Sequence, residues 1–114
     1  MAYTDLKYLK TITEGDKEIL REMIELFLMQ VPEYIANMHA FYQAGHFDLL
    51  GREAHKAKSS LDIVGMTELG KEMKILQLKI LEGVDRDGCL VYINLFETQC
   101  KEAIEELQAE LAVL

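Results

Sequence analysis

Long apolar runs are missing from the sequence, and their absence excludes a membrane-spanning segment. A transmembrane helix needs about 18 or more predominantly apolar residues in succession, and no stretch of this chain approaches that length. The first residues also lack the basic-then-apolar pattern of a secretory signal. We therefore expect a cytoplasmic protein that does not associate with a membrane.

Cysteine is scarce, which bears on metal and redox chemistry. Cys89 and Cys100 are the only two cysteines, and they lie eleven residues apart, without the CxxC spacing of a zinc or redox site. This spacing favours two buried or half-buried thiols in a reducing compartment. We expect no metal site formed by cysteine.

Proline occurs once in 114 residues, while the strong helix formers Leu, Glu, Lys, Met and Ala dominate. Half of the residues are hydrophobic, which is typical of a globular chain rather than a disordered one. The length suits a single core. The composition therefore predicts one all-α domain spanning residues 1–114.

Basic residues are too few for a nucleic-acid-binding protein, because the net charge of −8 would repel phosphate. The charge is unevenly spread, however. Residues 51–80 contain six basic and four acidic side chains and are therefore +2, which leaves −10 for the rest of the chain. This local positive field favours an anionic ligand or an acidic partner surface.

Apolar residues spaced three and four apart predict four amphipathic helices joined by short turns. We expect an antiparallel up-down four-helix bundle over about 16–112, preceded by a short N-terminal helical arm over about 1–15. The predicted helices cover about 4–12 in the arm and about 17–44, 47–64, 67–82 and 89–112 in the bundle.

Local signals set the ends of these helices. Asp16 is the predicted N-cap of the first long helix, and Gly45 and Gly83 are predicted C-caps. Pro32 lacks a backbone donor and disfavours helix at the preceding residue. The pattern around Pro32 fits one kinked helix, and two abutting helices would give a similar pattern.

The third helix carries the most informative stretch of the chain. Leu50, Ala54, Ala57, Leu61 and Val64 follow a four-three-four-three spacing and form its predicted buried stripe. At 3.6 residues per turn, a second set of residues centres about 120° away from that stripe. This second set is Gly51, His55, Lys58, Ser59 and Asp62. His55 should therefore lie on the flank or outside of the helix.

Two enzymatic alternatives fit poorly. Di-metal bundles use Glu-x-x-His pairs, but the residues three before the histidines are Ala36, Gln43 and Arg52, so we expect no metal. Ser59 and Asp62 share a face with His55, yet a convex helix provides neither an oxyanion hole nor a substrate pocket for a hydrolytic triad.

A lone exposed imidazole can instead act as a nucleophile. Near neutral pH much of it is uncharged, which leaves a ring nitrogen free to attack a phosphoryl group. Lys58, three residues on, could hold the negative charge of the product. The other requirements of phosphoryl transfer, including a metal ion, would have to come from a partner.

The run His55-Lys56-Ala57-Lys58-Ser59-Ser60-Leu61-Asp62-Ile63-Val64-Gly65 resembles the core of histidine-containing phosphotransfer (HPt) domains, often seen as His-x-x-Lys-Gly-Ser-x-x-x-x-Gly. The stretches at 27–32 and 69–73 are also similar to that family. The resemblance implies a four-helix bundle in which His55 is the phosphoacceptor and Lys58 supports the phosphate. Ser59 replaces the family's usual glycine but is still small.

The resemblance also implies the partners. HPt domains of multistep two-component phosphorelays carry phosphoryl groups between receiver domains and are not autonomous kinases, so we expect the receivers of a hybrid sensor kinase and of a response regulator. No cofactor is expected on this chain, and Mg²⁺ is expected only on the receiver. We expect a monomer.

The surface expected to meet a receiver domain surrounds His55. We call it the predicted docking surface, and it comprises Gly51, Arg52, Ser59, Asp62, Lys71 and Lys74. An alternative from another class keeps this surface but needs no chemistry. In that alternative the chain is a helical interaction module that binds a signalling partner, and His55 is dispensable.

Overall fold

Five α-helices are found in the computed structural model, which describes residues 2–83 and 85–114. They are α1 (Lys7–Ile12), α2 (Lys17–Ala44), α3 (Phe47–Ile63), α4 (Thr67–Glu82) and α5 (Cys89–Ala112). No strand occurs in these two described ranges. Met1 in the predicted arm and Val84, which follows the predicted C-cap Gly83, lie outside them.

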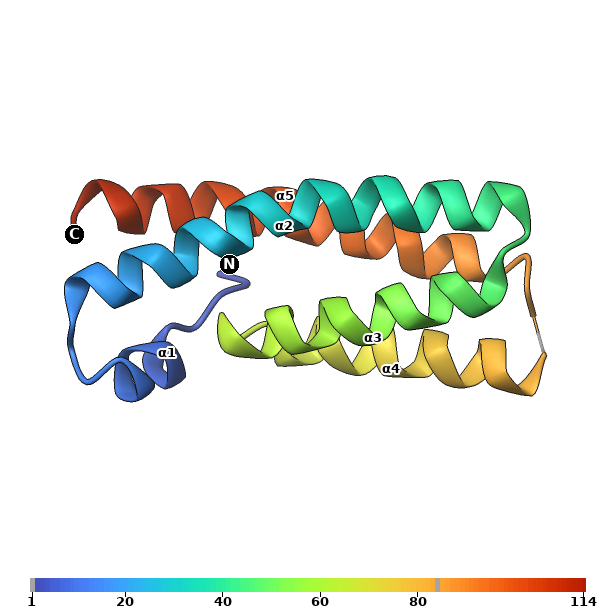
Figure 1. The fold of residues 1–114 in the computed structure, drawn as a ribbon, viewed down its shortest axis with the longest axis horizontal. Coiled ribbons are helices and arrows are strands. Elements are labelled where there is room, and N and C mark those ends of the chain that lie inside the picture. Colours follow the sequence, from blue (N-terminus) through green and yellow to red (C-terminus); the bar gives the residue numbers. More distant parts are fainter. Residues whose placement is uncertain (1, 84) are drawn as a thin grey trace.

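The helices form two layers, with α2 and α5 in the upper layer and α3 and α4 in the lower layer of Figure 1. The 28 residues of α2 span about 42 Å at 1.5 Å per residue, close to the 43 Å long axis of the molecule. Of the helix pairs, α3 and α4 pack most extensively. The predicted all-α, antiparallel up-down four-helix bundle with an N-terminal helical arm is confirmed.

No helix in the described part of the chain combines the length and the apolar character that crossing a membrane requires.

The predicted helix ends are confirmed where the sequence carried a specific signal. The Asp16 carboxylate accepts hydrogen bonds from the backbone N–H groups of Glu18 and Ile19, which α2 leaves unpaired in its first turn. Gly45 and Gly83 end α2 and α4 in the left-handed conformation, with φ of 73° and 70°.

Pro32 lies inside α2, which is one continuous helix rather than two abutting ones. The two halves of α2 run in different directions in Figure 1, as expected where a proline removes one helical hydrogen bond.

The core lies between the two layers. Leu50, Ala54, Ala57, Leu61 and Val64 of the predicted α3 stripe are all fully buried, so the rotation of α3 is as predicted. They pack with buried residues of the other long helices, including Ile24, Val31, Met38, Met73, Leu76, Ile93 and Phe96.

The N-terminal segment covers the end of the bundle that α3 and α4 do not reach. These two helices have 17 and 16 residues, against 28 and 24 for α2 and α5, so the longer pair extends beyond the α3–α4 turn. In Figure 1 α1 lies below the extension of α2. Leu6 and Leu9 are buried there.

Two sets of hydrogen bonds attach this segment. The Asp5 N–H donates to the Val64 carbonyl at 2.9 Å, beside the α3–α4 turn. The backbone N–H groups of Tyr3 and Thr4 and the Thr4 hydroxyl donate to the Glu106 carboxylate at 2.7–3.1 Å. Burial alone would raise the pKa of Glu106, but these hydrogen bonds outweigh it and lower that pKa.

The α3–α4 turn can hold only glycine at position 65. Gly65 has a φ of 81°, which is strained for other residues, and a Cβ atom there would collide with the backbone of Asp5. The turn and the N-terminal segment therefore fit together because Gly65 has no side chain.

Candidate functional site: an exposed histidine on α3

His55 is exposed on α3 because its neighbours fix the rotation of the helix. Ala54 and Ala57 have no exposed surface, and their small side chains bring α3 close to the core. His55 lies on the side of α3 that faces solvent between α2 and α4. An imidazole held on a rigid helix and open to solvent can be reached by another macromolecule.

Lys58, the predicted phosphate support, is half-buried and forms an ion pair one turn further along α3. Its Nζ atom donates to Oδ2 of Asp62 at 2.8 Å, and the two side chains are 34% and 41% exposed. The structure therefore brings together two of the predicted site residues, and it gives Lys58 a partner other than His55.

Gly70 of α4 makes room for this pair. A Cβ atom at position 70 would lie 2.8 Å from Oδ1 of Asp62 and 3.5 Å from Cγ of Lys58. Gly70 is buried, and glycine inside a helix costs about 1 kcal/mol relative to alanine, so it needs a structural reason. That signal was present in the sequence, but only the packing of α4 on α3 shows what the glycine accommodates.

Gly51 is less accessible than its place in the predicted docking surface implied, and its contact with a partner stays a prediction. It is buried, and a Cβ atom there would lie 3.7 and 3.8 Å from two carbon atoms of Ile80. Its exposure is low because Gly51 lies on the flank of α3 that α4 covers. Helical spacing gives the direction of a residue but not the position of the neighbouring helix.

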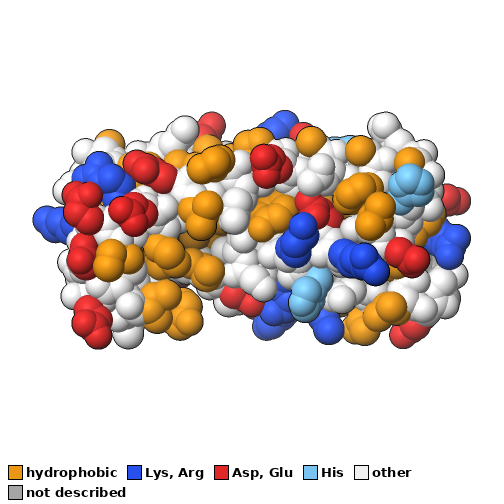
Figure 2. Space-filling model, in the orientation of Figure 1, with side chains coloured by type: hydrophobic (Ala, Val, Ile, Leu, Met, Phe, Trp, Pro, Cys, Tyr) orange, Lys and Arg blue, Asp and Glu red, His pale blue; other side chains and the backbone are white. Residues whose placement is uncertain are grey.

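Basic side chains lie near His55, and Arg52 and Lys56 line a surface concavity together with it. Figure 2 shows Lys and Arg side chains gathered beside a histidine in the lower half of the molecule, where α3 and α4 lie. The basic residues of these two helices are Arg52, Lys56, Lys58, Lys71, Lys74 and Lys79. Acidic side chains gather at the left end, so the asymmetry predicted from the sequence is present on the surface.

Most of these cations are already paired. Lys56 binds Glu53 at 3.3 Å, Lys71 binds Glu68 at 3.1 Å and Lys79 binds Asp85 at 3.7 Å. Among the residues that the structure describes, Arg52 and Lys74 are exposed and form no ion pair within 4 Å. These two predicted docking residues are therefore the cations most available to an anionic partner.

Lys71 and Lys74, the two lysines of the predicted docking surface, are not equivalent. Lys74 lies four residues after Gly70 and three before Gln77, so the three share one stripe of α4. Gly70 faces Lys58 and Asp62, and Gln77 lines a surface concavity together with His55. Lys74 is therefore on the side of α4 that faces the helical turn from His55 to Lys58, whereas Lys71 is offset toward Glu68.

Gln77 was not predicted, and its environment singles it out. Its Oε1 atom is buried, and among the described residues it has no hydrogen-bond partner. A buried acceptor without a donor is unfavourable by about 1–3 kcal/mol. Nothing in the sequence distinguishes this glutamine from others. Its position beside His55 becomes visible only when α4 is packed on α3.

Polar contacts with α2 hold the other flank of α3. Glu53 is only 4% exposed, and its carboxylate accepts from Asn37 Nδ2 at 2.7 Å. One turn of α2 away, the Tyr34 hydroxyl is 3.0 Å from Ser60 Oγ, which donates to Gln30 Oε1 at 3.1 Å. These contacts fix α3 against α2 on both sides of His55, so the imidazole is mounted on a rigid support.

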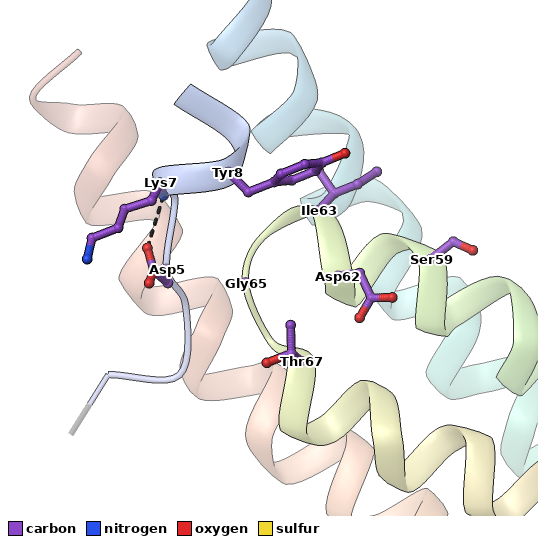
Figure 3. Close-up of a pocket in the computed structure, with 8 residues that line it drawn as sticks. All are labelled: Asp5, Lys7, Tyr8, Ser59, Asp62, Ile63, Gly65 and Thr67. Carbon is purple, nitrogen blue, oxygen red and sulfur yellow. Dashed lines mark hydrogen bonds between the residues drawn. The ribbon is translucent and has the colours of Figure 1, made fainter. Parts of the chain in front are cut away.

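A groove of about 710 Å³ opens on the same face as Ser59, which is exposed as predicted. It lies between the N-terminal segment and the C-terminal end of α3. Figure 3 shows Tyr8 of α1 reaching over Ile63 at the end of α3, with Asp62 and Ser59 at earlier positions of the helix. The sequence did not indicate that α1 contributes to this face, because the contact joins distant parts of the chain.

No group of three or more His, Cys, Asp and Glu side chains that could hold a metal ion occurs in the described residues. Cys89 and Cys100 are both buried, and burial raises the pKa of the Cys100 thiol to about 12. The pKa of Cys89 is also raised, chiefly by burial. The nucleophile that the site exposes is the imidazole of His55, with Arg52 and Lys58 three residues before and after it on α3.

The chain matches the family model described as Hpt domain over residues 22–110. The match covers more than half of the 114 residues, and it includes all of α3 and α4 and most of α2 and α5. Comparisons with curated proteins and with solved structures returned no match. The matched range contains His55, Lys58 and every residue of the predicted docking surface.

Proposed function

The chain belongs to the Hpt domain family, whose members carry phosphoryl groups in phosphorelays, and from this we propose that it is a relay intermediate that works through His55. The phosphoryl group would come from the phospho-aspartate of one receiver domain and pass to the aspartate of another. The observation that carries the proposal is an exposed imidazole on a rigid helix, which lines a surface concavity together with Arg52 and Lys56.

The transfer needs one bond to form and one to break. A lone pair on a His55 ring nitrogen attacks phosphorus, the P–O bond of the aspartyl phosphate breaks, and the aspartate leaves as a carboxylate. The second step reverses these roles with another receiver. Lys58 would balance the charge of the phosphoryl group on His55.

Gln77 supports the proposal through its unpaired acceptor. We propose that, when a receiver domain is bound, Gln77 Oε1 accepts a hydrogen bond from one ring N–H of His55, which leaves the other ring nitrogen as the nucleophile. A buried acceptor without a donor calls for an explanation, and a role in catalysis is one such explanation. Gln77 would therefore fix the tautomer and the orientation of the imidazole.

The remaining components would come from the partner. Mg²⁺ would be held by the receiver domain, as would the phosphorylatable aspartate, so this chain would not act as a kinase on its own. Arg52, Lys74, Lys71, Ser59 and Asp62 would contact the receiver. We propose that the relay operates in the cytoplasm, with the domain as a monomer.

Incubation with a phosphorylated receiver domain tests the assignment. The parent should gain acid-labile, base-stable phosphate, and His55→Gln should gain none. His46→Gln is a matched control, because His46 is also exposed but lies in the α2–α3 turn. If His55→Gln is labelled as well as the parent, His55 is not the acceptor. If His55→Gln fully restores signalling in cells, the chain acts as an interaction module instead.

A further inference from the structure

Lys58 pairs with the carboxylate of Asp62, which takes no part in the proposed phosphoryl transfer. We propose, on the basis of the function above, that Asp62 is a positioning residue. It draws Lys58 away from His55 in the unphosphorylated protein and so limits how strongly the phosphohistidine is stabilised. The direct contact is the 2.8 Å ion pair between Lys58 Nζ and Asp62 Oδ2.

The geometry of a helix sets up a competition for Lys58. Side chains on a helix lean toward its N-terminus, so Lys58 by itself would cover the turn that carries His55. Asp62 lies one turn away in the opposite direction. Lys58 therefore has two possible partners, and the unphosphorylated structure shows it with Asp62.

The competition is close enough to be reversed by phosphorylation. A basic residue that precedes its acidic partner by four positions is the weaker order of the two, and partly exposed ion pairs are weak in general. A phosphoryl group carries up to two negative charges and several acceptor oxygens, whereas Asp62 carries one charge. Lys58 should therefore move to the phosphohistidine, with Asp62 opposing that move.

Gly70 makes this arrangement possible. The carboxylate of Asp62 lies in the space that a Cβ atom of residue 70 would fill, at 2.8 Å from Oδ1. Alanine at position 70 should displace Asp62 and weaken its hold on Lys58. Asp62→Asn and Gly70→Ala change different helices, yet both should release Lys58.

The test is the equilibrium between a phosphorylated receiver and this domain. Asp62→Asn should raise the ratio of phospho-His55 to phospho-receiver by about two- to fivefold, which is the range that a partly exposed ion pair permits. Gly70→Ala should change the ratio in the same direction. Glu102→Gln, an exposed site on α5, controls for net charge and should leave the ratio unchanged.

A double-variant comparison separates positioning from a general effect on structure. In a Lys58→Ala background, Asp62→Asn should have no effect on the ratio, because no lysine remains to be released. An unchanged or lower ratio in Asp62→Asn, or an equal rise with and without Lys58, would overturn the inference. If the parent itself gains no phosphate on His55, the proposed function has failed, and this inference fails with it.

Discussion

Two glycines in the α3–α4 interface have different consequences for the side chains around them. Gly70 leaves space that the Asp62 carboxylate occupies, so a methyl group there meets a polar atom at 2.8 Å. Gly51 faces Ile80, where a methyl group would be in ordinary van der Waals contact at 3.7 Å. Packing therefore explains Gly70 but does not require a glycine at position 51.

Gly51→Ala should stabilise the domain by about 1 kcal/mol, because alanine favours helix and the added methyl group is buried against Ile80. Urea denaturation should show a higher midpoint with an unchanged slope. Gly45→Ala is the matched control, since the φ of 73° at Gly45 should make the same change destabilising. Destabilisation by Gly51→Ala would mean that α3 and α4 are packed too closely for a methyl group.

Gln77→Leu should separate stability from transfer. Removal of a buried, unpaired acceptor should leave the free energy of unfolding unchanged or higher. The rate of phosphoryl transfer to His55 should fall by about two- to tenfold, which corresponds to the loss of one orienting hydrogen bond. A quenched time course of labelling by a phosphorylated receiver measures the rate. Gln108→Leu, at an exposed position of α5, is the control. An unchanged rate would remove Gln77 from the site.

At the scale of helices, the sequence predicted the features that are set within a single helix. It missed the features that are set by the packing of one helix on another. The α3 stripe from Leu50 to Val64 and the caps Asp16, Gly45 and Gly83 follow from local spacing and backbone chemistry, and all are found. The exposure of His55 also follows from this spacing, because burial of the α3 stripe turns His55 toward solvent.

The remaining features depend on which helix covers which flank. The low exposure of Gly51 was not foreseen, because Gly51 lies between the buried stripe and the exposed face of α3, and α4 covers it. The contacts of Gln77 and Gly70 with the α3 face are set by the register between α3 and α4, which periodicity does not give. The attachment of the N-terminal segment to Glu106 joins residues more than a hundred positions apart, and no local signal marks it.

That attachment should depend on pH. The pKa of Glu106 lies below its ordinary value of 4.5, so its contribution is fully present above pH 4.5 and is lost as the pH falls through the lower, folded-state pKa. Glu106→Gln should reduce the free energy of unfolding at pH 7 by about 1–2 kcal/mol, because a neutral side chain accepts the hydrogen bonds from Tyr3 and Thr4 more weakly.

Urea denaturation at pH 7 and at pH 3 checks this effect. The difference between the parent and Glu106→Gln should shrink at the lower pH, where the parent carboxylate is increasingly protonated. Glu105→Gln, at an exposed neighbouring position, should show no such difference at either pH. A difference that is equal at both pH values would show that the Glu106 charge does not matter.

The whole molecule carries a charge of −8, yet residues 51–80 are +2. Such an asymmetric field should orient an acidic partner toward α3 and α4 during encounter. Arg52 and Lys74 should contribute most, since they form no ion pair among the described residues.

The rate of association with a receiver domain should therefore fall as salt rises from about 0.1 M to about 1 M, over which the screening length drops from about 10 Å to about 3 Å. Arg52→Ala combined with Lys74→Ala should slow association at low salt and flatten the dependence on salt. Lys17→Ala, an exposed cation at the start of α2, is the control and should leave the dependence unchanged. Equal salt slopes for the double variant and the parent would contradict this role.

The burial of Cys89 and Cys100 makes this protein convenient for site-specific labelling. Both thiols are buried and have raised pKa values, so maleimide reagents should not react with them while the protein is folded. A cysteine introduced at an exposed position of α5, such as Glu102, would then be the reactive thiol of the chain. A fluorophore attached there could follow receiver binding without any change to the native cysteines.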